Sequence, residues 1–129
     1  MTQNLVDVRN VTKDFQNGKV TVRALRGLDL TVEKGDFLSI VGPSGSGKTT
    51  LLNIIGALDV PTGGDVHVLG EDLSKLGRRA RAEMRLMSLG FVFQAYNLIP
   101  VLTARENVEF VLELQAVGVE RTDRAMSVL

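Results

Sequence analysis

The beginning of the chain alternates apolar and polar side chains, which is the pattern of half-buried β-strands. The alternation runs over residues 5–11 and again over 28–32, with a further β-rich stretch at 20–22. Between them, Gln16-Asn17-Gly18-Lys19 has the composition of a tight turn. We therefore predict an antiparallel β-layer at the start of the chain, with one face in solvent.

A mostly apolar run at Phe37–Val41 interrupts this alternation. Such a run is typical of a strand that is covered on both faces. A glycine-rich segment follows directly, and from Thr49 to Leu58 the apolar side chains have the spacing of a helix. The pattern therefore predicts a central strand, a glycine loop and a helix, in that order.

Shorter elements are predicted after the break at Pro61-Thr62-Gly63-Gly64. Residues 65–70 alternate as a strand, and residues 74–89 have helical spacing with a basic face. Residues 89–93 are a second strand candidate, and a loop follows them. Strands and helices thus interleave through the middle of the chain, which favours an α/β fold.

The last helical pattern has clear boundary signals. Thr103-Ala104-Arg105-Glu106 has the spacing of a capping box, and Gly118 supplies a stop. Residues 122–129 open with capping residues and contain no terminating residue, so we expect the chain to stop inside a further helix. Because no linker or internal repeat divides the chain, residues 1–129 are interpreted as one incomplete α/β domain.

The composition excludes several classes of protein. Fifteen basic and 15 acidic residues give a formal net charge of zero, which argues against a nucleic-acid partner. The chain has no cysteine, which excludes a disulfide framework and a thiolate metal site and is consistent with the cytosol. No apolar run approaches the roughly 20 residues needed to span a bilayer, so we expect a chain that does not cross the membrane.

The glycine loop carries the strongest chemical signal. Gly42-Pro43-Ser44-Gly45-Ser46-Gly47-Lys48-Thr49 fits the phosphate-loop pattern G-x-x-x-x-G-K-[ST], with a predicted strand before it and a helix after it. Glycine lets backbone N–H groups approach a triphosphate, Lys48 can reach the β- and γ-phosphates, and the Thr49 hydroxyl can bind Mg²⁺. The residues expected to bind the phosphates are Gly42, Ser44, Gly45, Ser46, Gly47, Lys48, Thr49 and Thr50.

Together with Leu51-Leu52 and the later segment Pro61-Thr62-Gly63-Gly64-Asp65-Val66, this loop resembles the nucleotide-binding subunit of an ABC transporter. The resemblance covers essentially the whole chain. The strings at 89–100 and 102–108 are similar to the branch that includes lipoprotein-releasing and macrolide-exporting systems. The implied fold is a P-loop NTPase core, with a mainly parallel sheet and helices, behind an N-terminal antiparallel β-layer. The implied function is that of an ATPase that powers export or release of a lipoprotein, peptide or drug.

The resemblance also implies roles for residues outside the phosphate loop. Phe15 falls where the family places an aromatic side chain that stacks on adenine, although many members have tyrosine there. Gln94, at the end of Phe91-Val92-Phe93-Gln94, corresponds to the glutamine that reaches Mg²⁺ and the attacking water. Gln94, Tyr96 and Leu98 are then candidates for coupling to the membrane subunit.

The same resemblance implies ATP and Mg²⁺ as ligands, and a transmembrane permease and a second nucleotide-binding subunit, as a homodimer, as partners. It places the protein on the cytoplasmic face of the membrane. Residues 1–129 contain no signature motif, no Walker B strand ending in Asp-Glu and no switch histidine. We therefore interpret the chain as the N-terminal part of one such domain, without a catalytic residue of its own and with little or no hydrolysis. The strand at Phe37–Val41 would then lack a parallel neighbour and expose its apolar side chains.

Two other interpretations remain open from the residues. The chain could be a nucleotide-binding module that acts without turnover. It could also belong to another class of P-loop protein, a kinase or a GTPase. In that case Phe15, the turn at Pro61–Asp65 and Gln94 would all match by coincidence.

Overall fold

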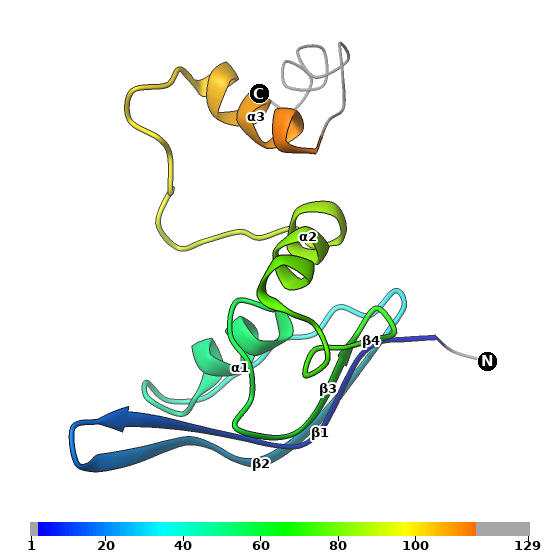
Figure 1. Cartoon of the computed structure of the whole chain (residues 1–129), viewed down its shortest axis with the longest axis vertical. Helices are drawn as coiled ribbons and strands as arrows, with labels where there is room; N and C mark the ends of the chain where they lie inside the picture. Colours follow the sequence, from blue (N-terminus) through cyan, green and yellow to red (C-terminus); the bar gives the residue numbers. More distant parts are fainter. Residues whose placement is uncertain (1–2, 116–129) are drawn as a thin grey trace. The chain divides into compact units, whose positions relative to one another are not determined.

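The computed structural model describes residues 3–115, which fall into two compact units with the division after Ala82. The first unit holds an antiparallel sheet, one complete helix and the start of a second helix, and the second unit holds the rest of that helix, an irregular segment and a further helix (Figure 1). Among the described residues, no helix combines the length and the apolar character needed to cross a membrane.

A long hairpin forms one side of the sheet. β1 (Asn4–Asn17) and β2 (Val20–Glu33) pair antiparallel around a turn at Gly18, and β3 (Gly63–Val68) pairs with the other edge of β1. The short β4 (Glu71–Asp72) completes the order β2-β1-β3-β4, which Figure 1 shows as one layer. The predicted antiparallel β-layer is therefore confirmed, and it is longer than the alternating stretches indicated.

A bulge in β1 brings the backbones of β1 and β3 unusually close. Asn10 has a φ of 48° at a shift in register, and its N–H donates to Asp29 Oδ1 at 2.6 Å. Opposite it, Gly64 has a φ of 82°, and a Cβ built there would lie 2.4 Å from the Asn10 carbonyl oxygen and 2.6 Å from that of Arg9. Only a residue without a side chain can occupy that position without movement of the backbone.

One helix covers the inner face of this sheet. α1 (Lys48–Ile55) begins one residue earlier and ends three residues earlier than predicted, and it ends there because Gly56 caps it and Ala57 turns into the left-handed region at a φ of 56°. In the first unit, the buried apolar side chains come from the sheet, from α1 and from the segments after α1 and β4, and they form its core. They are Val8, Val11, Leu25, Leu51, Ile54, Ala57, Val66, Val68 and Leu73.

The predicted central strand is not formed within residues 3–115. Residues 37–41 are irregular, with Phe37 fully exposed and Val41 88% exposed. A strand needs neighbours to complete its hydrogen-bond ladder, and within the described residues no other segment pairs with this one. The exposure agrees with the expectation that this run lacks a parallel neighbour.

The strand predicted at residues 89–93 is also wrong. This segment is irregular, Val92 is fully exposed, and the rings of Phe91 and Phe93 stack on each other at 5.6 Å. α2 (Arg78–Ser88) precedes it and begins four residues later than predicted. The delay arises because Asp72 binds the N–H and hydroxyl of Ser74 in a turn, which satisfies the backbone before a helix can begin.

The capping box is confirmed at the start of α3 (Ala104–Leu114). Thr103 Oγ1 accepts from the Glu106 N–H at 3.2 Å, and Glu106 Oε2 accepts from the Thr103 N–H at 2.7 Å. The stop expected at Gly118 and the helix expected at 122–129 lie outside the described residues.

The capping box makes the stability of α3 depend on pH. Hydrogen bonds from the backbone and side chain of Thr103 lower the pKa of Glu106 below its ordinary value of 4.5. Because the folded pKa is the lower one, the stabilisation is complete above pH 4.5 and is lost as the pH falls through the folded pKa. We expect the Cα chemical shifts of residues 104–107 to move toward coil values in that range. In Glu106→Gln, whose amide oxygen accepts at every pH, this movement should vanish, and its persistence would contradict the assignment.

Candidate phosphate-binding site

Gly47 shapes the junction between the glycine loop and α1. It is the N-cap residue with a φ of 93°, and the first bond of the helix runs from the Leu51 N–H to its carbonyl at 2.9 Å. A Cβ on Gly47 would lie 2.7 Å from the Ala24 carbonyl oxygen on β2, so both the conformation and the space require glycine. Because glycine has no capping side chain, the N–H groups of the first turn are open to an anion.

The Lys48 side chain donates hydrogen bonds to several residues of its own loop. Its ammonium donates to the carbonyl of Gly42 at 2.5 Å, to that of Pro43 at 2.7 Å and to Ser46 Oγ at 3.3 Å. The Ser46 N–H closes a turn on the Pro43 carbonyl at 3.2 Å. The positive charge is thus held at the centre of the loop, where a phosphate would replace these carbonyls as its partner.

A cavity of about 450 Å³ lies beside this loop, a size that accepts a small-molecule ligand. It is lined by Ala24, Ser44, Gly45, Gly47, Lys48, Thr49 and Thr50. Of these described residues none is acidic, one is cationic and three carry hydroxyls, which is the donor set expected around phosphate. The structure therefore brings together six of the eight predicted phosphate-binding residues.

The other two lie on the far side of Lys48. Gly42 and Ser46 line a second, largely apolar cavity of about 260 Å³, and Lys48 takes part in both. Ala24 on β2 was not predicted, and no local pattern could have identified it. Its place at the cavity depends on the register of the hairpin, which sets Ala24 two residues beyond the partner of Phe15.

Phe15 lies near the tip of β1, opposite Val22, with 42% of its surface exposed. Phe15 is not among the described residues that line the 450 Å³ cavity. The ammonium of Lys13 lies over its ring, 5.2 Å from the centroid. The adjacent Asp14 is bound to Arg23 at 2.8 Å, and this hydrogen bond lowers the pKa of Asp14. The exposed Phe15 ring thus lies on a strand where the side chains of Lys13 and Asp14 both make electrostatic contacts.

The donor set is compatible with Mg²⁺ held chiefly by a nucleotide. Thr49 is exposed and places a hydroxyl oxygen, a ligand type that Mg²⁺ prefers, at the cavity. The described part of the chain contains no cluster of three His, Cys, Asp or Glu side chains that could hold a metal ion by itself. Phosphate oxygens and water would therefore supply most of the coordination sphere.

Gln94, Tyr96 and Leu98 belong to the second unit and are exposed there, Tyr96 almost fully. The predictions did not include Asn107, which fixes the loop that follows these residues. Its side chain accepts from the Ile99 N–H at 2.8 Å and donates to the Thr103 carbonyl at 2.9 Å. The second unit thus presents apolar side chains from a segment anchored at its far end.

Comparison with known proteins matches residues 25–129 to the family described as ABC transporter. The chain belongs to this family. This ABC transporter chain is 51% identical over 106 residues to the lipoprotein-releasing system ATP-binding protein LolD of Shewanella frigidimarina, covering 82% of this chain and 44% of that protein. It is 49% identical over 105 residues to the macrolide export ATP-binding/permease protein MacB of Marinobacter nauticus, covering 81% of this chain and 16% of that protein.

A solved structure confirms the fold class. The dimeric ATP-binding cassette MJ0796, bound to ADP and Pi, has a TM-score of 0.87 and 44% identity, over 95% of this chain and 54% of that one. An uncharacterised ABC transporter ATP-binding protein of Thermotoga maritima is 46% identical over 128 residues, which are 98% of this chain and 55% of that protein. The ABC transporter chain thus spans about half the length, or less, of these relatives.

Proposed function

We propose that this chain is the nucleotide-binding part of an ABC transporter subunit, and that the intact subunit powers export or release of a lipoprotein, peptide or drug by ATP binding and hydrolysis. The observation that carries the proposal is the cavity at the start of α1. There, uncapped N–H groups, the Lys48 ammonium and three hydroxyls converge without an acidic neighbour among the described lining residues. That environment suits a chain of phosphates.

Each predicted site residue has a role in this proposal. The eight predicted phosphate-loop residues bind the triphosphate, and Phe15 stacks on the adenine. Thr49 and Gln94 contribute oxygens to Mg²⁺, which when bound neutralises phosphate charge. Membership of the family supports two partners for the intact protein. They are a transmembrane permease that contacts Gln94, Tyr96 and Leu98, and a second copy of the subunit, on the cytoplasmic face of the membrane.

A second candidate function is nucleotide binding without turnover. It is favoured by the same lining, because hydrolysis needs a group that orients or polarises the attacking water, and no carboxylate lines the cavity among residues 3–115. The two functions differ in one measurable quantity, the release of phosphate from bound ATP. Release that depends on Lys48 would support the motor function over the binding-only function.

Calorimetric titration with Mg-ATP, Mg-tripolyphosphate and AMP tests the proposed function. We expect ATP and tripolyphosphate to bind, and AMP to bind at least about tenfold more weakly, because charge-assisted hydrogen bonds to the β- and γ-phosphates are each worth about 1.5–3 kcal/mol. Equal affinity for AMP and ATP would show that the phosphate loop is not the binding determinant. Failure of both ATP and tripolyphosphate to bind would refute the proposal for this chain.

A further inference from the structure

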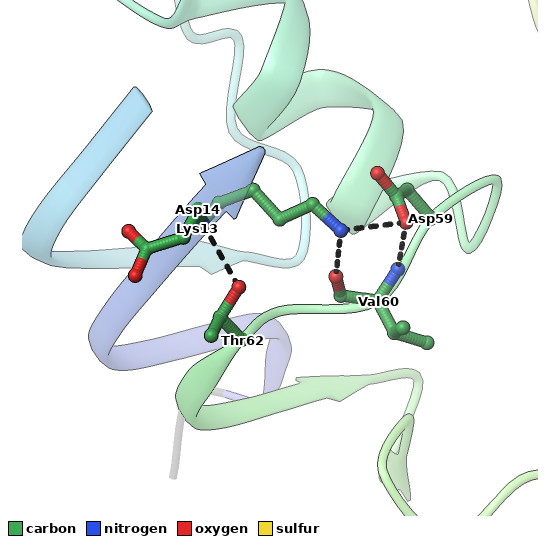
Figure 2. Close-up of polar contacts among 5 residues, drawn as sticks. All are labelled: Lys13, Asp14, Asp59, Val60 and Thr62. Atoms are coloured by element: carbon green, nitrogen blue, oxygen red, sulfur yellow. Dashed lines mark hydrogen bonds and ion pairs between the residues drawn. The ribbon is translucent and has the colours of Figure 1, made fainter. Parts of the chain in front are cut away.

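The strand that carries Phe15 is fastened to the segment that follows α1. Figure 2 shows the Lys13 side chain extending from β1 to residues 59 and 60, where its ammonium binds Asp59 Oδ1 at 2.9 Å and donates to the Val60 carbonyl at 2.8 Å. The same Asp59 oxygen accepts from the Val60 N–H at 2.8 Å. The ammonium therefore has two fixed partners on a segment more than 40 residues away in the chain.

The burial of these groups shows that the contact is more than a surface ion pair. Only 12% of the Lys13 side chain is exposed, against 36% for Asp59. Burial alone would raise the pKa of Asp59, but the hydrogen bonds from Lys13 and the Val60 N–H outweigh it, and the net pKa is lowered. The Lys13 ammonium stays bound to these partners, because breaking the contacts would leave a charged group unpaired where little water can reach it.

The residues on both sides of Lys13 are fastened to the same segment. The Asp14 N–H donates to Thr62 Oγ1 at 2.9 Å, as Figure 2 shows, and the Thr62 N–H donates to the Thr12 carbonyl at 2.9 Å. Three consecutive β1 residues thus bind residues 59–62. Phe15 is the next residue along the strand, so little freedom remains in the backbone that carries its ring.

The fastened segment is continuous with the phosphate site. α1 begins at the phosphate cavity with Lys48, and its Asn53 carbonyl accepts from the N–H groups of Leu58 and Asp59 just after the helix ends. A rigid helix of eight residues, about 12 Å long, therefore joins the phosphate loop to the partner of Lys13. The Lys13 ammonium in turn lies over the Phe15 ring, 5.2 Å from its centroid.

We propose that Lys13 is a positioning residue for nucleobase binding, which holds the Phe15 ring at a set place relative to the phosphate loop. Its ammonium occupies one face of the ring, so the base stacks on the opposite face. This inference rests on the proposed function, because it requires Phe15 to stack on the base of a nucleotide whose phosphates lie at α1. It adds a residue that touches neither the phosphates nor the base.

The test compares two ligands that share the phosphates and differ in the base. We expect Lys13→Met to weaken Mg-ATP binding about fivefold, because the ring loses a cation–π contact that restricts its orientation before the base binds. Binding of Mg-tripolyphosphate, which has no base, should stay within about twofold of the wild type. Lys13→Arg, which restores a cation of similar reach, should recover most of the ATP affinity. Lys19→Met, at the exposed hairpin turn, is the matched control and should change neither ligand.

A double-mutant cycle with Phe15→Ala then isolates the route of the effect. If Lys13 acts through the ring, Lys13→Met should add less than about twofold to the loss of ATP affinity already caused by Phe15→Ala. Equal weakening of ATP and tripolyphosphate would show that Lys13 merely supports the fold of the phosphate site, and would overturn the inference while leaving the proposed function intact. Full additivity with Phe15→Ala, or no loss of ATP affinity in Lys13→Met, would also overturn it.

The experiment also covers a variant that does not fold and a wild type that does not bind. If Lys13→Met does not fold, Asp59→Asn replaces it. This variant keeps the lysine and its bond to the Val60 carbonyl, and the same selective loss of ATP affinity is expected. If the wild type binds neither ATP nor tripolyphosphate, the proposed function fails and this inference fails with it, which is a different result from a loss confined to ATP.

Discussion

Lys48→Ala should abolish Mg-ATP binding, with a loss of affinity of roughly a hundredfold or more. The ammonium is the only cation among the described residues that line the phosphate cavity, and charge-assisted hydrogen bonds of this kind are each worth about 1.5–3 kcal/mol. The substitution also removes the three hydrogen bonds from Lys48 to Gly42, Pro43 and Ser46, so the loop loses contacts that stabilise its conformation. Calorimetric titration with Mg-ATP measures the effect directly.

Two variants separate the charge from other consequences of the substitution. Lys48→Arg keeps the charge but replaces a compact ammonium by a planar guanidinium that cannot reach the same three oxygens, so it should restore only a small part of the affinity. Lys75→Ala removes a cation from the exposed surface, where Lys75 pairs with Asp72 at 3.3 Å, and should leave binding unchanged. Retention of wild-type affinity by Lys48→Ala would remove the basis for the phosphate site.

Gly64→Ala should destabilise the sheet by roughly 2–5 kcal/mol, the sum of a left-handed backbone cost and an overpacking cost. The added Cβ would lie 2.4 Å and 2.6 Å from two backbone oxygens of the β1 bulge, and backbone atoms within a sheet cannot move aside as a flexible side chain can. Because a small domain is stable by only about 5–15 kcal/mol, a loss of this size is a large part of the total. Urea unfolding measures it as a lower midpoint.

Gly70→Ala is the matched control for this prediction. Gly70 has nearly the same φ, 84° against 82°, but a Cβ built there meets no atom within 4 Å. It should therefore cost only the conformational term, about 1–2 kcal/mol. A loss of stability in Gly64→Ala no larger than in Gly70→Ala would show that the bulge relaxes to admit the side chain.

The predictions from the sequence succeeded where neighbouring residues decide the structure. The capping box at Thr103 and Glu106, the turn at Gly18 and the alternation along β1 are contacts within a few residues, so their pattern is visible in the chain itself. The phosphate loop has the same character, since its turns and the start of α1 are local. The helix boundary at Gly56 was missed by three residues, because the buried left-handed turn at Ala57 depends on the core beneath it.

Strands and long-range contacts required the tertiary structure. The apolar run at Phe37–Val41 has strand character, but a strand exists only when neighbours complete its hydrogen bonds, and within residues 3–115 none does. The contact between Lys13 and Asp59 joins residues 46 positions apart, and nothing in the sequence near either one predicts the other. The same holds for the approach of Gly64 to the bulge at Asn10.

By itself, the sequence determined the residue types of the candidate phosphate site: a glycine loop, Lys48 and the hydroxyl residues that follow it, at the start of a helix. It did so because phosphate binding relies on backbone N–H groups and residue types that adjoin one another in the chain. The tertiary structure decided how that loop relates to the rest of the first unit. It set Ala24 at the edge of the cavity through the hairpin register and fastened the strand of Phe15 to the segment after α1. Those relations depend on which distant segments pack together, and packing is a property of the whole fold.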